Sequence, residues 1–60
     1  MQPMTKEQSD VVLAQMGARY VQTRDGVEWW MWDAKKMWVG RRVVDRSRNL
    51  VELRQAPCSC

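Results

Sequence analysis

Residues 20–32 read YVQTRDGVEWWMW, in which two runs of strand-forming residues flank the pair Asp25-Gly26. An Asp-Gly pair between such runs is the strongest short-range signal for a β-hairpin. With a two-residue loop, the expected cross-strand pairs are Arg24 with Val27, Gln22 with Trp29, Val21 with Trp30 and Tyr20 with Met31. The sequence therefore predicts an antiparallel hairpin over this stretch.

A short helix is expected before the hairpin. Thr5 and Gln8 have the spacing of a capping box, and Pro3 suits the approach to a helix start. Gly17 is a natural left-handed residue to end the helix. The apolar stripe between these signals is Val12, Leu13 and Met16, with Lys6, Asp10 and Ala14 on the opposite side. We therefore expect a helix over residues 5–17 with one apolar face.

Two more strands are expected after the hairpin. The polar residues 33–36 predict a turn, and residues 37–44 return as a third strand. Residues 49–54 follow a turn that begins at Asp45 and alternate weakly, so a fourth strand is favoured and a short second helix is the alternative.

The predicted fold class is α+β, with an N-terminal helix packed on a three- to four-stranded antiparallel β-meander. The whole chain, residues 1–60, is expected to form one small domain, with the meander at 18–54 and a tail at 55–60. A chain of this length buries only about 60% of the surface that its unfolded form exposes. The core is therefore thin, and there is little room for a deep cleft.

The net charge of +3 is unevenly distributed along the chain. Residues 1–34 hold three basic and five acidic side chains, whereas residues 35–60 hold seven basic and two acidic side chains. Such asymmetry predicts a surface that meets an anionic partner, either nucleic acid or an acidic protein patch. The alternative is a charged sheet edge that deters aggregation.

Both faces of the predicted hairpin are apolar. One face is expected to carry Tyr20, Val27, Trp29 and Met31, and the other Val21, Trp30 and Trp32. One amphipathic helix can cover only one face, and Trp and Arg are the residues most enriched at binding hot spots. We therefore place Trp29 in the core. The expected partner-binding residues are Trp30, Trp32, Lys36, Arg41, Arg42, Arg46 and Arg48. The alternative is that the tryptophans simply form the core.

Catalysis is disfavoured by the residues that the sequence lacks. There is no His, so an imidazole base and a Ser-His arrangement are excluded. The glycines at 17, 26 and 40 are isolated, so no phosphate-binding loop is present. Cys58 and Cys60 supply only two of the four ligands of a closed zinc site, and we expect them to be reduced tail thiols. No enzyme activity, cofactor or metal is therefore expected.

The expected function is that of a small non-enzymatic protein-interaction module. The N-terminus lacks a secretory signal and no apolar stretch approaches the ~20 residues of a membrane span, so a cytoplasmic location without membrane contact is expected. The order of one helix and three strands is similar to small toxin and double-stranded-RNA-binding folds. This similarity is topological and implies no activity, since those toxins use a histidine. A protein of this size is typical of inhibitors or adaptors from phages or mobile elements that act on larger host complexes.

Nucleic-acid binding is the alternative function. Bases of a single strand stack on aromatic rings while Arg and Lys contact phosphates. Glu28 and Asp33 argue against it, because they neighbour the tryptophans in sequence and would repel phosphate. A homodimer is also expected, since an uncovered sheet face can pair with its own copy.

Overall fold

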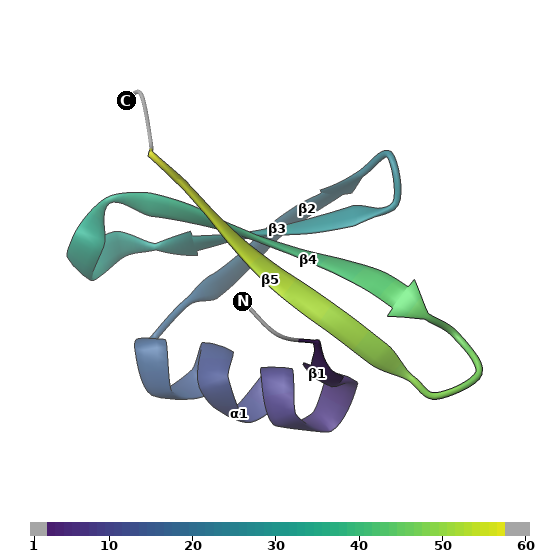
Figure 1. The fold of residues 1–60 in the computed structure, drawn as a ribbon. Helices are drawn as coiled ribbons and strands as arrows, with labels where there is room; N and C mark the ends of the chain where they lie inside the picture. Colours follow the sequence, from purple (N-terminus) through teal and green to yellow (C-terminus); the bar gives the residue numbers. More distant parts are fainter. Residues whose placement is uncertain (1–2, 58–60) are drawn as a thin grey trace.

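One helix packs on one face of a five-stranded antiparallel sheet in the computed structural model, which describes residues 3–57. The elements in chain order are β1 (Met4–Thr5), α1 (Lys6–Met16), β2 (Arg19–Arg24), β3 (Val27–Trp32), the 3-10 helix η1 (Asp33–Lys35), β4 (Met37–Asp45) and β5 (Leu50–Pro57). The strand order across the sheet is β1-β5-β4-β3-β2 (Figure 1). The predicted α+β class and the helix on an antiparallel meander are confirmed, and β1 is an additional edge strand.

The two ends of α1 follow local signals in the sequence. The Thr5 hydroxyl accepts a hydrogen bond from the backbone N–H of Gln8 at 3.1 Å, and the Gln8 side chain accepts one from the Thr5 backbone N–H at 3.0 Å. Gly17 ends the helix with a left-handed φ of 73°, which a residue without a Cβ adopts at no steric cost. The capping box and the glycine stop are confirmed.

Within residues 3–57, no helix has the length and the apolar character needed to cross a membrane.

The β2–β3 hairpin turns at Asp25 and Gly26, whose φ angles are both positive, 53° and 78°. This conformation belongs to the two-residue turns whose twist matches that of the flanking strands. The two predicted pairs nearest to the turn are confirmed, Arg24 with Val27 and Gln22 with Trp29. The turn chemistry thus sets the register at this end of the hairpin.

Farther from the turn, an irregularity at Val21 shifts the register of β2. Tyr20 pairs with Trp30, and Arg19 pairs with Met31. The predicted pairs of Val21 with Trp30 and of Tyr20 with Met31 are therefore wrong. A β-bulge inserts one extra residue into one strand, which counting from the turn cannot locate. The shift places Tyr20 and Trp30 together, with their rings 5.6 Å apart in an edge-to-face arrangement.

The last described segment is a strand. β5 pairs with β4 along its length, so the fourth-strand interpretation is correct and the second helix is wrong. β5 continues through Gln55 to Pro57, where a tail was expected, while Cys58 and Cys60 lie outside the described residues. The outer edge of β5 pairs with β1, Met4 with Val51 and Thr5 with Leu50. A strand of two residues is too short to give a periodic signal.

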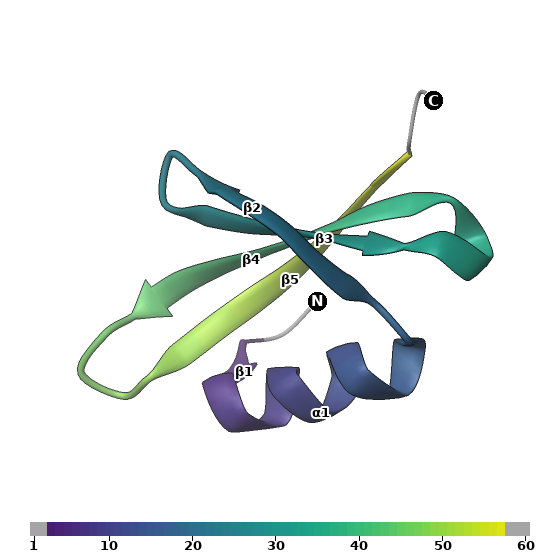
Figure 2. The same ribbon diagram turned by 180° about the vertical axis from the view of Figure 1, so that it is seen from behind.

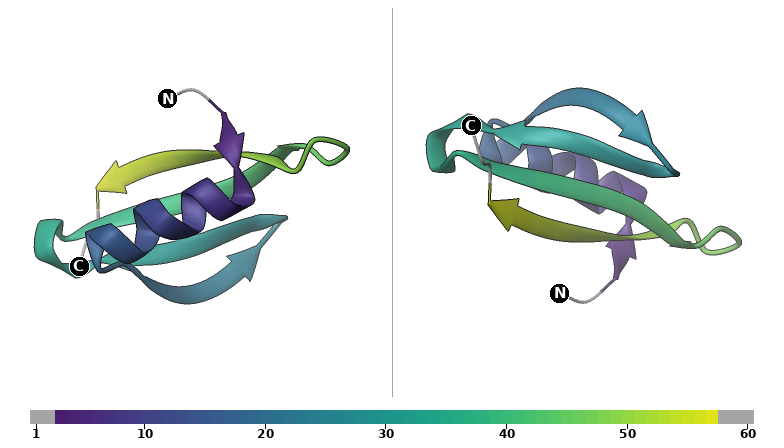
Figure 3. Two further views of the ribbon diagram at one scale, coloured as in Figure 1. Left: turned by 90° about the horizontal axis from the view of Figure 1, so that it is seen from below. Right: turned by 90° about the horizontal axis from the view of Figure 1, so that it is seen from above.

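The helix α1 covers one face of the twisted sheet, and no other described element covers the opposite face (Figure 1, Figure 2). In Figure 3, α1 lies in front of the central strands in the view from below and behind them in the view from above. The buried apolar side chains are Leu13, Met31, Val39, Val51 and Leu53. Leu13, Val39 and Leu53 form one cluster, and the partly buried side chains packed against it include Trp30 and Trp32. We call this side of the sheet the helix face and the other side the open face.

The expectation that Trp29 lies in the core while Trp30 and Trp32 face outward is wrong. All three side chains are half-buried, but Trp30 and Trp32 pack under α1. Strand β4 explains the difference, because Trp30 pairs with the buried Val39 whereas Trp29 pairs with Gly40. Because the hairpin is apolar on both faces, its own sequence does not determine which face the helix covers. The apolar residues of β4 and β5 determine it.

Arg41 joins the helix to the sheet from a buried position, with only 6% of its surface exposed. Its guanidinium donates hydrogen bonds to the Ser9 hydroxyl at 2.8 Å, to the Asp10 carboxylate at 2.5 Å and to the Glu28 carboxylate at 2.7 Å. Its Cζ lies 5.5 Å from the ring centroid of Trp30. Burial acts to lower the pKa of Arg41, but the hydrogen bonds with the two carboxylates outweigh this effect and leave the pKa raised.

This network differs from one expectation. Asp10 lies on the exposed side of the helix, as expected, and its carboxylate also accepts a bond from Arg41. Arg41 itself was expected on the partner-binding surface, and the structure buries it instead. A buried guanidinium is tolerated only when its hydrogen bonds are satisfied. The sequence pattern treats arginine as an exposed residue, which is its usual position.

Replacement of Arg41 tests this structural role. Arg41→Ala should lower the free energy of unfolding by about 3 kcal/mol, because it removes the cation between Asp10 and Glu28 beside the core. Arg42→Ala is the matched control, since the Arg42 side chain forms an exposed ion pair with Glu52 at 2.6 Å and should cost less than about 1 kcal/mol. Urea denaturation measures both losses. Equal losses in the two variants would contradict the role given to Arg41.

Candidate functional site

The open face presents three rows of side chains that run across the strands. The central row is Gln22, Trp29, Gly40 and Arg54. The row nearer to the β2–β3 turn is Arg24, Val27, Arg42 and Glu52, and the row farther from the turn is Arg19, Met31, Trp38 and Ala56. Aromatic side chains therefore occupy the middle of this face and charged side chains its margins, an arrangement that makes it the candidate site.

Trp29 and Trp38 form an edge-to-face pair on neighbouring strands. Their ring centroids lie 6.4 Å apart and their planes meet at 81°, a geometry that aromatic quadrupoles favour. Gly40 makes room for this pair, because a Cβ built there would lie 2.9 Å from Cζ3 of Trp29. The missing side chain at Gly40 thus lets the Trp29 indole lie close against β4.

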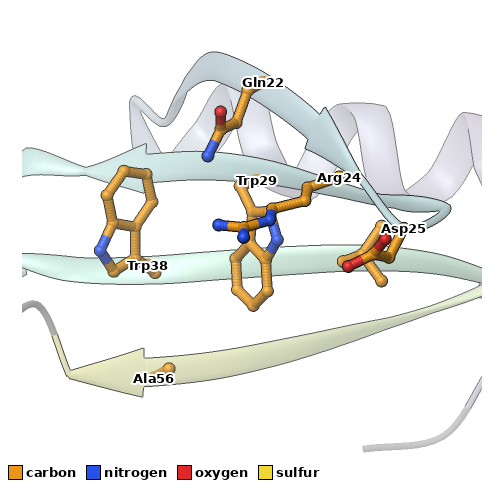
Figure 4. A pocket seen from close by; sticks show the side chains of 7 residues that line it. Gln22, Arg24, Asp25, Trp29, Trp38 and Ala56 are labelled. Atoms are coloured by element: carbon orange, nitrogen blue, oxygen red, sulfur yellow. The ribbon is translucent and has the colours of Figure 1, made fainter.

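A groove of about 500 Å³ opens beside the two rings. Its apolar lining comes from the tryptophans with Val27 and Ala56, and its polar lining from Gln22, Arg24 and Asp25. Figure 4 shows Trp29 and Trp38 next to each other along the groove, with Gln22 and Arg24 reaching toward them from β2. A smaller hollow of about 80 Å³ adjoins Trp29 on the side of Arg42, Glu52 and Arg54.

The arginines around this groove differ in how they are paired. Arg42 is held by Glu52 at 2.6 Å, and Arg19 by Asp33 at 2.9 Å. The hydrogen bond with Asp33, followed by the charge of that carboxylate, raises the pKa of Arg19. Arg24 and Arg54 have no ion-pair partner within residues 3–57. These two exposed guanidinium groups are therefore available to an anion.

The chemistry of the groove suits binding. Its lining offers two aromatic rings, a guanidinium, an amide and one carboxylate. Among these seven lining residues there is no nucleophile beside a base and no pair of carboxylates, the arrangements on which covalent and acid–base catalysis depend. Aromatic rings and a guanidinium around a half-open groove are the features of a docking site.

The structure places the predicted partner-binding residues in different parts of the molecule. Trp30, Trp32 and Arg41 lie on the helix face. Arg42 lies on the open face beside Trp29. The remaining residues are exposed in turns, Lys36 directly after η1 and Arg46 and Arg48 between β4 and β5. The predicted set therefore does not form one continuous surface.

The turn between β4 and β5 is shaped by Asp45. Its carboxylate accepts hydrogen bonds from the Ser47 hydroxyl at 2.7 Å and from the backbone N–H of Arg48 at 3.2 Å. These bonds, that of Ser47 first, lower the pKa of Asp45. Asp45 thus has the backbone-shaping role that an aspartate commonly has in a turn.

Sequence reasoning missed Trp38, Arg24, Arg54 and Gln22 as candidate site residues and placed Trp29 in the core. A usable signal was present in β4, where Trp38, Gly40 and Arg42 alternate with Met37, Val39 and Arg41. Two-residue periodicity puts the first set on one face. The isolated glycine within a strand also indicates close approach of another group, which here is the Trp29 ring.

Comparison with protein-family models, curated proteins and solved structures gives no significant match to this chain. The candidate site therefore stands on its geometry.

Substitution of Gly40 tests the geometry of the aromatic pair. Gly40→Ala should cost about 1–3 kcal/mol of stability, because the new methyl group displaces the Trp29 ring from β4. In a proton–nitrogen NMR spectrum, the indole N–H signals of Trp29 and Trp38 should move, while those of Trp30 and Trp32 on the helix face serve as internal controls. Larger shifts in the two control signals would contradict this packing.

Proposed function

We propose that this chain is a small non-enzymatic binding module that docks an anionic macromolecule on its open face. The observation that carries the proposal is the groove beside the Trp29–Trp38 pair, with Arg24 in its lining and Arg54 in the smaller hollow on the other side of Trp29. Neither arginine has an ion-pair partner within residues 3–57. The helix face is already filled by α1. An exposed groove that combines tryptophan and arginine has the composition of a binding hot spot.

Burial considerations support a role for these tryptophans outside folding. A chain of 60 residues has few large side chains with which to form a core, yet Trp29 and Trp38 lie on the face that α1 does not cover. Contact with a partner would remove their exposed ring surface from water, a favourable change of about 25 cal/mol per Å². Docking on this face therefore gives the chain a way to bury the aromatic surface that folding leaves exposed.

The proposal includes the biological setting that the sequence suggests. The protein would act in the cytoplasm, without a cofactor, as an inhibitor or adaptor of a larger host complex. The homodimer expected from the sequence stays a prediction. Trp30 and Trp32 pack under α1 and are not free to form a dimer contact. A homodimer would therefore use the open face or a sheet edge.

Affinity capture from an extract of the organism that encodes the chain tests the proposal. Trp29→Ala should reduce recovery of the partner about tenfold, the effect expected for a hot-spot tryptophan. Val11→Ala is the control, because Val11 is 56% exposed on α1, away from the open face, and should recover the partner fully. Equal recovery by wild type and the folded Trp29→Ala variant would contradict docking on the open face.

A further inference from the structure

We infer that the partner of the open face is a single-stranded nucleic acid, with a base stacked in the groove at Trp29 and Trp38 and phosphates held by Arg24 and Arg54. This inference rests on the proposed docking function and names the partner. A single strand presents unpaired bases and a regular series of anions together. The open face presents the complementary groups, aromatic rings in its centre and cations on both sides.

The aromatic pair gives a base two kinds of contact. Trp29 and Trp38 line the same groove with their planes at 81°, so a base stacked on one ring would lie nearly perpendicular to the other. Gln22 lies in the same cross-strand row as Trp29 and lines the same groove. Its amide both donates and accepts hydrogen bonds, as recognition of an exposed base edge requires.

The positions of the unpaired arginines indicate how the strand would lie. Arg24 is on β2 and Arg54 is on β5, on opposite sides of the central strands β3 and β4. They lie three strand spacings apart across the sheet and in adjacent rows along it, a separation of about 16 Å at about 4.8 Å per spacing and about 3.4 Å per residue. A nucleic-acid strand that crosses the sheet at Trp29 would therefore meet a cation on each side of the stacked base.

The acidic residues that argued against phosphate binding are positioned away from the groove or neutralised. Glu28 lies on the helix face, bonded to Arg41 and to the indole N–H of Trp30. Asp33 is bonded to Arg19. Asp25, at the hairpin turn, is the one carboxylate among the residues that line the groove. The electrostatic objection raised by Glu28 and Asp33 therefore does not apply to the groove.

An acidic protein segment would also be attracted to Arg24 and Arg54, and the groove distinguishes the two partners. A carboxylate-rich peptide would gain from the cations but would place few planar groups on the rings. Nucleobases are planar, and every base has a face that stacks on tryptophan. The adjacent rings beside an amide thus favour the nucleic acid.

Fluorescence anisotropy of labelled single-stranded DNA and RNA oligonucleotides tests the inference across a range of salt concentrations. Trp29→Ala should weaken binding about tenfold by removing the stacking surface. Arg54→Ala should leave the fold intact, because Arg54 is exposed. It should reduce the slope of log affinity against log salt by about 0.7, the value for one phosphate contact to a single strand. Lys6→Ala is the charge-matched control on the exposed side of α1 and should leave both the affinity and the slope unchanged.

Duplex DNA of the same sequence should bind less tightly than the single strand, because its bases are stacked on one another, and equal binding would overturn the inference. Single-strand binding that Trp29→Ala and Arg54→Ala leave unchanged would also overturn it. If no oligonucleotide binds at low salt while a protein is captured from the extract in a Trp29-dependent manner, the partner is a protein and the docking function stands. If neither experiment shows dependence on Trp29, both proposals fail.

Discussion

The guanidinium of Arg41 holds α1 against one particular face of the sheet. It reaches Ser9 and Asp10 on the helix and Glu28 on the neighbouring strand, so three elements meet at one cation. Rotation of the helix would take away Ser9 and Asp10, two of the three hydrogen-bond partners of this buried guanidinium, which is destabilising. This constraint fills the helix face and leaves Trp29 on the open face.

Local chemistry made much of the fold predictable from the sequence. The Thr5–Gln8 capping box, the Gly17 stop and the Asp25-Gly26 turn depend on residues close in the chain, so their signals survive without knowledge of tertiary contacts. Burial of Arg41 depends on Ser9, 32 positions away along the chain. No local pattern reports such a contact. Because arginine is usually exposed, the sequence predicted an exposed Arg41.

The candidate site was harder to predict because its residues come from four strands. Val21 adds an irregularity to β2 that a count from the turn cannot detect, and the hairpin alone is apolar on both faces. Gly40 affects both the packing of the sheet and the geometry of the candidate site. It weakens β4 as a core strand, since glycine contributes no side chain to pack, yet it provides the space against which Trp29 lies. The positions of Arg24 and Trp29 in the hairpin followed from the turn, but which face α1 covers depends on the buried side chains of β4 and β5.

The central claim is that α1 closes the face of Trp30 and leaves that of Trp29 and Trp38 to solvent. Hydrogen exchange at the indole N–H groups, followed by NMR, measures this division directly. The Trp30 N–H donates to Glu28 at 3.1 Å and should exchange slowly. Within residues 3–57, every buried polar side-chain atom has a hydrogen-bond partner. The indole N–H groups of Trp29 and Trp38 form no hydrogen bond with the described residues, so they are not buried. Water should therefore reach both groups, and their exchange should be fast. Slow exchange at Trp29 and Trp38 with fast exchange at Trp30 would contradict the account.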